Sequence, residues 1–171
     1  LLAETARAMV EEIDHARRCF ALASAYGDSP VGPGPIDTTD AQGSTDALTV
    51  LLETFTDGCI NESMAAAEAQ LLAERVTDPV LRETLQCIAE DETRHAALAW
   101  KTVRWILQRH PELQPTLVEA WVRIRANWDA RLERLAAQDP TPELDAHGVL
   151  NGPGRAQLGT QVLTQVIAPC L

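Results

Sequence analysis

A glutamate followed three residues later by a histidine occurs twice in this chain, and this repeated pattern constrains the fold more than any other feature. The first copy, E-E-I-D-H-A-R, contains Glu12 and His15, and the second, I-A-E-D-E-T-R-H-A, contains Glu92 and His95. Residues i and i+3 lie on one face of an α-helix, so each pair presents an oxygen and a nitrogen ligand to one point. Two such helices, joined by a lone glutamate from a third, nearly complete a dimetal site inside a helix bundle.

The composition predicts that the rest of the chain is helical as well. Of the 171 residues, 46% are apolar, 23% charged and 4% aromatic, which suits a globular protein with a substantial core. Valine and isoleucine are sparse beside alanine, leucine, glutamate and arginine, and this mixture favours helix over sheet. The predicted fold class is therefore all-α.

Charge and hydropathy argue against two classes of partner. The formal net charge is −11 and Lys101 is the only lysine, whereas proteins that bind nucleic acid cluster lysine and arginine against the phosphates. No run approaches the roughly 20 apolar residues that are needed to span a bilayer. We therefore expect neither a nucleic-acid partner nor a membrane partner.

The four cysteines are widely spaced and form no C-x-x-C pair. This spacing disfavours a rubredoxin-type iron centre, a zinc ribbon and a thioredoxin-like redox motif. We expect reduced thiols, mostly buried, in a cytoplasmic protein.

Proline, glycine and helix-capping residues divide the chain into helices and connections. The predicted helices cover residues 1–26, 45–76, 79–109, 112–137 and 155–167, with a long surface connection over 27–42 and a loop over 138–154. Residues 1–110 are expected to form the bundle with the metal motifs, and residues 111–171 a helical extension packed on it. Along the first helix an apolar stripe recurs every three or four residues: Leu2, Ala6, Met9, Ile13, Ala16 and Phe20.

The second predicted helix contains a glycine and a glutamate that each need a physical explanation. Gly58 costs about 1 kcal/mol relative to alanine in a helix interior, which indicates either close packing against another helix or a local bulge one turn before Glu62. Glu62 lies among apolar and small residues, where a buried acid is costly unless a metal ion or another partner compensates it. The predicted metal ligands are therefore Glu12, His15, Glu62, Glu92 and His95.

Charged residues also flank the two motifs. Glu11 and Asp91 directly precede Glu12 and Glu92 and project about 100° away from them round the helix. This placement indicates acids on the surface or acids that support the ligands from behind. Arg94 could pair with a carboxylate across the helices, although a solvated ion pair is the simpler expectation.

The stretches that carry these residues resemble the ferritin-like superfamily of diiron-carboxylate proteins, over roughly the first 108 residues of the chain. They are E-I-D-H-A-R from Glu12, D-G-C-I-N-E ending at Glu62, and D-E-T-R-H-A-A-L-A-W around Glu92. They look like a bacterial branch of ferritin-like domain proteins. The resemblance implies a four-helix bundle that holds two metal ions, with iron expected first and manganese or a mixed Fe/Mn pair as alternatives.

The resemblance also implies a role for each ligand. Glu12 and Glu92 would bridge or chelate, His15 and His95 would each bind one metal, and Glu62 would be a terminal or bridging ligand.

In that family a further glutamate comes from a helix before the first motif. Here the residues from Leu1 onward already have the pattern of a helix interior. We expect the first helix of the bundle to be missing from the chain as given. The alternatives are an asymmetric site, in which another acid such as Glu119 substitutes, and a site that binds metal weakly or not at all.

Three functions fit these observations. The first is an O2-activating oxidase or monooxygenase that acts on an unknown small-molecule substrate in a cavity near Cys19, Gly58 and Cys59. The second is a ferroxidase or iron-handling protein, which the additional C-terminal helices fit poorly. The third is a helical binding module with an incomplete metal site. A ferritin-type storage protein would also need a closed shell of many subunits, and for the enzyme we consider a homodimer.

Overall fold

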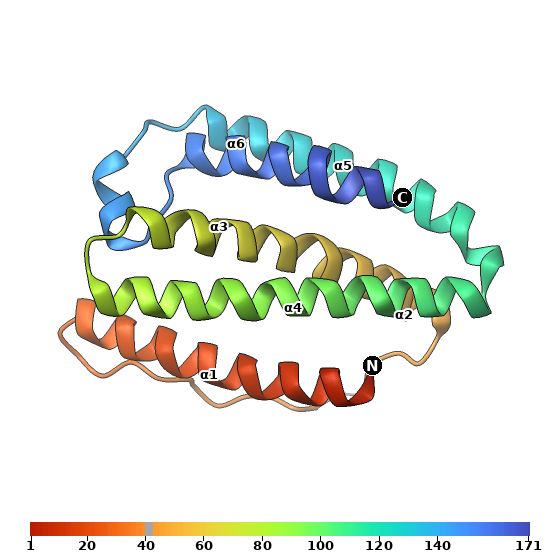
Figure 1. Ribbon diagram of the computed structural model, residues 1–171, viewed down its shortest axis with the longest axis horizontal. Helices are drawn as coiled ribbons and strands as arrows, with labels where there is room; N and C mark the ends of the chain where they lie inside the picture. The colour runs from red at the N-terminus through yellow and green to blue at the C-terminus, as the bar shows by residue number, and fades with distance from the viewer. Residues whose placement is uncertain (40–42) are drawn as a thin grey trace.

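Figure 1 shows the computed structural model, which describes residues 1–39 and 43–171 and consists of helices and loops throughout those ranges. The all-α prediction is confirmed. The principal helices are α1 (Leu2–Tyr26), α2 (Ala47–Glu53), α3 (Glu62–Arg75), α4 (Pro79–Arg109), α5 (Gln114–Ala136) and α6 (Gly152–Val162). The shorter helical segments are η1 (Thr54–Asn61), η2 (Pro111–Leu113), η3 (Pro142–His147), η4 (Leu163–Ile167) and η5 (Ala168–Cys170).

Side-chain caps define the starts of two helices. The side chain of Asp46 accepts a hydrogen bond from the backbone N–H of Thr49 at the start of α2, 2.9 Å away. Asp78 does the same at the start of α4 for Val80, and Pro79 occupies the first turn, where its missing N–H costs nothing. The connection between α3 and α4 is so short that the two helices run antiparallel as neighbours (Figure 1).

The second predicted helix differs from expectation because it is interrupted by a π-helix. It begins at Ala47, two residues later than predicted, and η1 separates α2 from α3 with π-helical geometry. Gly58 lies inside η1, and a Cβ atom built on it would lie 2.5 Å from the Cβ of Ala99 on α4. Both explanations for this glycine therefore hold, since it allows a close helix contact and lies in a local bulge before Glu62.

The main hydrophobic core lies between η1, the second half of α4, and the C-terminal helices. It contains Leu51, Phe55, Ile60, Val103, Leu117, Leu132, Leu163 and Ile167, all at most 6% exposed. The ring of Phe55 is at the centre and meets the rings of Trp100 and Trp121 edge to face, with centroid distances of 5.9 and 6.1 Å. This core holds η1 firmly against α4, and α3 continues directly from η1.

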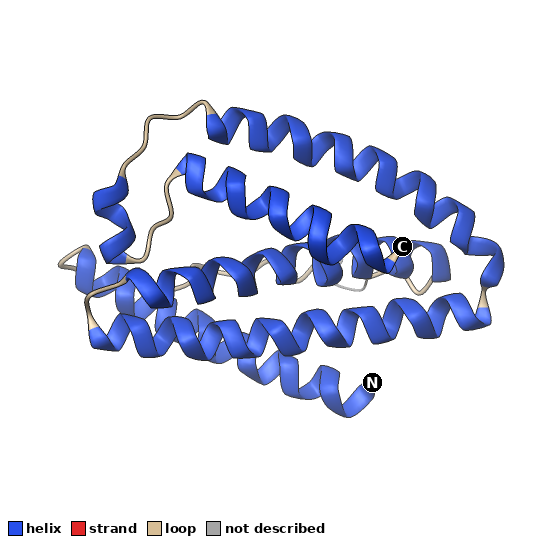
Figure 2. Cartoon of the chain, turned by 45° about the horizontal axis from the view of Figure 1, so that its top comes forward, coloured by secondary structure: helices blue, strands red, loops and turns tan. Residues whose placement is uncertain are grey.

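Helix α1 packs on α4 through a polar face, which the apolar stripe of its sequence did not predict. Its only buried residue is His15. The stripe lies on other faces of the helix, where Leu2, Met9 and Ile13 are 86%, 65% and 61% exposed. Figure 2 shows α1 at the margin of the molecule, apart from α5 and α6.

Two smaller expectations also need correction. Only Cys59 is buried among the four cysteines, so the thiols are not mostly buried. The last helix begins at Gly152 rather than residue 155, because Asn151 caps it by accepting a hydrogen bond from the backbone N–H of Gly154. In the described ranges no helix combines the length and hydropathy that crossing a membrane requires.

Candidate metal centre

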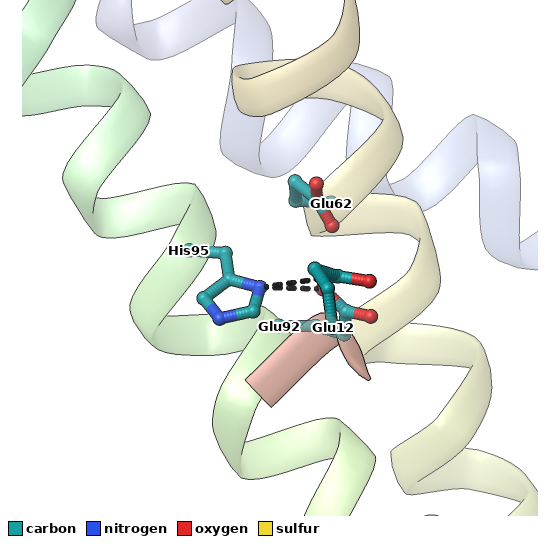
Figure 3. A group of neighbouring side chains, drawn as sticks. All are labelled: Glu12, Glu62, Glu92 and His95. Carbon is teal, nitrogen blue, oxygen red and sulfur yellow. Dashed lines mark hydrogen bonds and ion pairs between the residues drawn. The ribbon is translucent and has the colours of Figure 1, made fainter. Parts of the chain in front are cut away.

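Four of the five predicted ligands come together between α1, α3 and α4. Glu12, Glu62, Glu92 and His95 each offer one atom, and these four atoms all lie within 4.8 Å of one another. Glu12 belongs to α1, Glu62 to α3, and Glu92 and His95 to α4. Figure 3 shows the imidazole of His95 directed at the carboxylates of Glu12 and Glu92. Carboxylate oxygen and imidazole nitrogen in this combination are ligands of divalent iron, manganese and related ions. The cluster could therefore hold a metal ion.

Two local features position these side chains: the residue spacing along α4 and the π-helix before α3. The pair Glu92 and His95 shares one face of α4, as the i, i+3 spacing predicts. Glu62 is the first residue of α3 and follows η1 directly. Because a π-helix is wider than an α-helix, η1 changes the direction in which the next turn projects its side chains.

His95 lies against both motifs through its two ring nitrogens. Its Nδ1 atom is 3.1 Å from Oε1 of Glu12 and 3.1 Å from Oε2 of Glu92. Its Nε2 atom lies on the other side of the ring, 2.9 Å from Oε2 of Glu11 on α1. The ring therefore has one nitrogen at the cluster and the other held by a carboxylate outside it.

His15, the fifth predicted ligand, lies at the edge of the same cluster. Its Nδ1 atom is 3.4 Å from Oε1 of Glu92 and 3.8 Å from Oε2 of Glu12, and its ring centroid is 6.0 Å from that of His95. The residue is only 6% exposed. Within residues 1–39 and 43–171, its Nδ1 atom is buried and has no hydrogen-bond partner. A buried nitrogen without a partner is costly, and a cation among these carboxylates would satisfy it.

The carboxylates of the cluster disturb one another's ionisation. Burial raises the pKa of Glu62 to about 8, together with a hydrogen bond to Glu92 and the negative charges of Glu92 and Glu12. Burial also raises the pKa of Glu92, as do the charges of Glu12 and Glu11. Carboxylates that are this close cannot all ionise at low cost without a cation. The donor set and the unpartnered nitrogen of His15 therefore fit a metal ion.

An outer layer of charged residues surrounds the histidines. Asp91 accepts a hydrogen bond from Nε2 of His15 at 2.9 Å, and the guanidinium of Arg94 contacts both Asp91 and Glu11, the latter at 2.9 Å. Partial burial opposes ionisation of Glu11, but its hydrogen bonds with Arg7 and His95 and the charge of Arg94 outweigh this and lower its pKa to about 2.

The structure thus places Glu11 and Asp91 against the far nitrogens of the two histidines. Of the two alternatives, surface acids or acids that support the ligands, the second is therefore correct. The side chain of Arg94 is 41% exposed and pairs with Glu11 across the helices, which agrees with the expectation of a solvated ion pair. In the sequence, the sign of the acids' supporting role is that an acid directly precedes the glutamate in both motifs. Glu119, the suggested substitute ligand, is exposed on α5 and is outside the cluster.

Comparison with known proteins found no match. The chain matches no protein-family profile, no curated protein and no solved structure.

Proposed function

We propose that the cluster binds two divalent metal ions, iron by preference, and that the protein is an O2-activating oxidoreductase with a small-molecule substrate. The observation that carries the proposal is the Nδ1 atom of His15, which lies beside Glu92 and Glu12 and is buried without a hydrogen-bond partner in the part of the chain that the structure describes. It adds a second imidazole donor to a cluster that already contains three carboxylates and His95. Three carboxylates with two oxygens each and two imidazole nitrogens offer eight donor atoms, more than the six that one octahedral cation takes, and this suits a pair of ions.

Each residue has a distinct part in this proposal. Two ferrous ions, when bound, supply electrons for the reduction of O2. Glu12 and Glu92 each have carboxylate oxygens within 3.8 Å of both Nδ1 atoms, and these two residues would be shared between the ions. Glu62 approaches from α3 and must lose its proton to bind, because its pKa of about 8 favours the acid form without a cation.

The arrangement of the helices is compatible with a ferritin-like bundle in which α1, α3 and α4 provide three of the four helices. The exposed apolar residues of α1, including Met9 and Ile13, are where such a bundle would place a fourth. The buried small residues Ala66 and Ala96 lie one helical turn after Glu62 and Glu92. Small side chains beside the cluster suit a centre that admits O2.

Metal analysis tests the proposal directly. The protein would be loaded with Fe²⁺ without oxygen, freed of excess metal, and analysed for iron content and for O2 uptake. We expect two irons per chain, rapid O2 consumption and a small assembly. Glu92→Ala should lose at least one ion, whereas Glu90→Ala, an exposed acid on the same helix, should retain both.

Three outcomes would contradict the proposal or part of it. Unchanged metal content in Glu92→Ala would reject the ligand assignment. A large hollow assembly that accumulates an iron core would replace the oxidoreductase with an iron-storage protein. Failure of the wild-type protein to bind iron, manganese or a mixture would indicate a helical binding module with an incomplete site.

A further inference from the structure

The outer face of α1 carries a regular row of apolar residues that the described part of the chain leaves mostly open. The residues recur in alternating steps of four and three, and we call them the α1 seam: Leu2, Ala6, Met9, Ile13, Ala16 and Phe20. All except the half-buried Phe20 are exposed. A continuous apolar row on the surface is typical of a face that binds another protein chain.

The spacing of the α1 seam is that of a coiled coil. Its average step of about 3.5 residues is the heptad period, in which the seam residues alternate between positions d and a, beginning with Leu2 at d. Glu11 and His15, which bond to residues of α4, then occupy positions f and c on the other side of α1. The seam therefore requires a helix on the far side of α1 from α4. Figure 2 shows that α1 lies at the margin of the molecule, where such a helix can approach.

A second copy of α1 is the partner that fits this seam. A coiled coil needs a helix with an equally exposed heptad row, and among the described helices only α1 has one. The apolar row of α5, for example, includes Leu117 and Leu132, which are buried in the core. We infer that two copies of the protein associate through their α1 seams, which form a parallel two-stranded coiled coil around a twofold axis.

The charges beside the seam favour the parallel orientation. Glu12 occupies position g, and Arg17 occupies the e position five residues further on. In a parallel pair, g of one helix lies beside that e position of the other, so Glu12 of each copy meets Arg17 of the second copy. An antiparallel pair with the seams in register would instead bring the two Glu12 side chains toward each other, and like charges repel.

Arg17 and Glu12 are both accessible for this pairing. Arg7 and Arg18 form ion pairs with acids on α1 itself, whereas the exposed Arg17 forms none with the part of the chain that the structure describes. The side chain of Glu12 is 53% exposed. Because Glu12 also belongs to the candidate metal centre, the dimer places an arginine of each copy beside the centre of the other.

The single chain already provides α1 in the form that association needs. A free helix of three heptads is marginal in water. Here α1 is held against α4 by Glu11, His15 and their partners, so little ordering is required on association. The seam is short, however, and each chain has a net charge of −11. We therefore expect dimer and monomer in an equilibrium that depends on concentration.

Sedimentation equilibrium of the full chain tests the inference, in EDTA and at about 0.15 M salt to screen the net charge. The wild type should reach the mass of two chains at about 100 µM. Met9→Glu/Ile13→Glu should remain monomeric, because it buries four carboxylates in the seam of a dimer. The matched control is Val80→Glu/Val122→Glu, which changes equally exposed apolar residues on α4 and α5 and should dimerise like the wild type. Helical circular dichroism should be the same in all three proteins.

A cysteine at the start of the seam tests the orientation. Leu2→Cys would be introduced together with Cys19→Ser and Cys170→Ser, which remove the exposed thiols. In a parallel dimer the two introduced thiols are adjacent and should form an intermolecular disulfide on mild oxidation. In an antiparallel dimer they lie at opposite ends of the seam and should form none. The Cys19→Ser/Cys170→Ser protein without Leu2→Cys is the control and should not crosslink.

A charge reversal tests the pairing beside the seam. Arg17→Glu should weaken association about tenfold, because it replaces two attractive contacts with repulsion. Arg123→Glu reverses an exposed arginine on α5 and should leave the affinity nearly unchanged. Equal affinities of these two variants would reject the contact between Arg17 and Glu12.

Two results would overturn the dimer itself: a wild type that is monomeric at about 100 µM, and a dimer that persists in Met9→Glu/Ile13→Glu. A dimer that forms no disulfide in Leu2→Cys would reject the parallel arrangement. All these measurements are made without metal, so they do not depend on the proposed function. Metal binding by a monomeric wild type would reject the dimer and leave that function intact.

Discussion

Gly58 and Ala99 mark the closest approach of η1 to α4, since a Cβ atom built on Gly58 would lie 2.5 Å from the Cβ of Ala99. Neither backbone can yield easily, because Phe55 and Val103 anchor the two elements in the same core. This contact lies one turn before Glu62, and it fixes the distance from which that carboxylate reaches the cluster.

Gly58→Ala should therefore destabilise the protein. The overlap is expected to cost about 1–3 kcal/mol, which exceeds the gain of about 1 kcal/mol from replacing a helical glycine. Urea unfolding monitored by circular dichroism measures the difference. The double variant Gly58→Ala/Ala99→Gly returns the missing space and should recover most of the lost stability. Equal stability of the wild type and Gly58→Ala would show that the helices are not in close contact here.

The metal-free protein should become less stable as pH rises from about 5 to about 8. The pKa of Glu62 is raised from 4.5 to about 8 in the folded protein, so the folded state holds a proton that the unfolded state has already released. The free energy of unfolding should then fall with pH, by at most about 1.4 kcal/mol per pH unit.

Denaturation in EDTA at several pH values measures this slope. Glu62→Gln should flatten it, because the amide cannot ionise. Glu74→Gln, which changes an exposed acid on the same helix, should keep the wild-type slope. A slope of equal size in Glu62→Gln would assign the pH dependence to other groups.

Binding of Mn²⁺ should raise the midpoint temperature of unfolding, and this rise should depend on His15 as a ligand. A ligand that binds only the folded state stabilises it by about 2.7 kcal/mol at 100 times its dissociation constant. His15→Ala should lose a large part of this shift, since it removes one imidazole donor from the cluster. His110→Ala alters a histidine at the end of α4, outside the cluster, and should show the full shift. Identical Mn²⁺ responses in the two variants would exclude His15 as a ligand.

The thiols should fall into two classes of reactivity. Burial raises the pKa of the Cys59 thiol to about 12, with a smaller effect from Cys170, and a thiol without thiolate character reacts slowly. Cys19 and Cys170 are exposed and should react with a disulfide reagent in the native protein. Cys59 should react only on unfolding, as mass spectrometry of labelled peptides would show. Rapid native labelling of Cys59 would contradict its placement in the core.

The pairing of His15 with Asp91 and of His95 with Glu11 could not have been predicted from residue spacing alone. An i, i+3 pair shows which side chains share a helix face, but it does not show which acid of the opposite helix each ring nitrogen meets. Glu11 and Asp91 were recognisable as acids beside the motifs, yet their partners depend on how α1 is rotated against α4. That rotation also turns the apolar residues Met9 and Ile13 outward, against the ordinary expectation for an amphipathic helix.

The amino-acid sequence by itself determined the helical class and the caps of α2 and α4, because Asp46, Asp78 and Pro79 act through neighbouring backbone groups. It also determined which side chains could bind metal, since the two E-x-x-H motifs and Glu62 are local patterns. Only the tertiary structure decided the π-helix at Gly58 and the pairing of each histidine. Those features depend on contacts between residues far apart in the chain, where packing rather than local propensity sets the geometry.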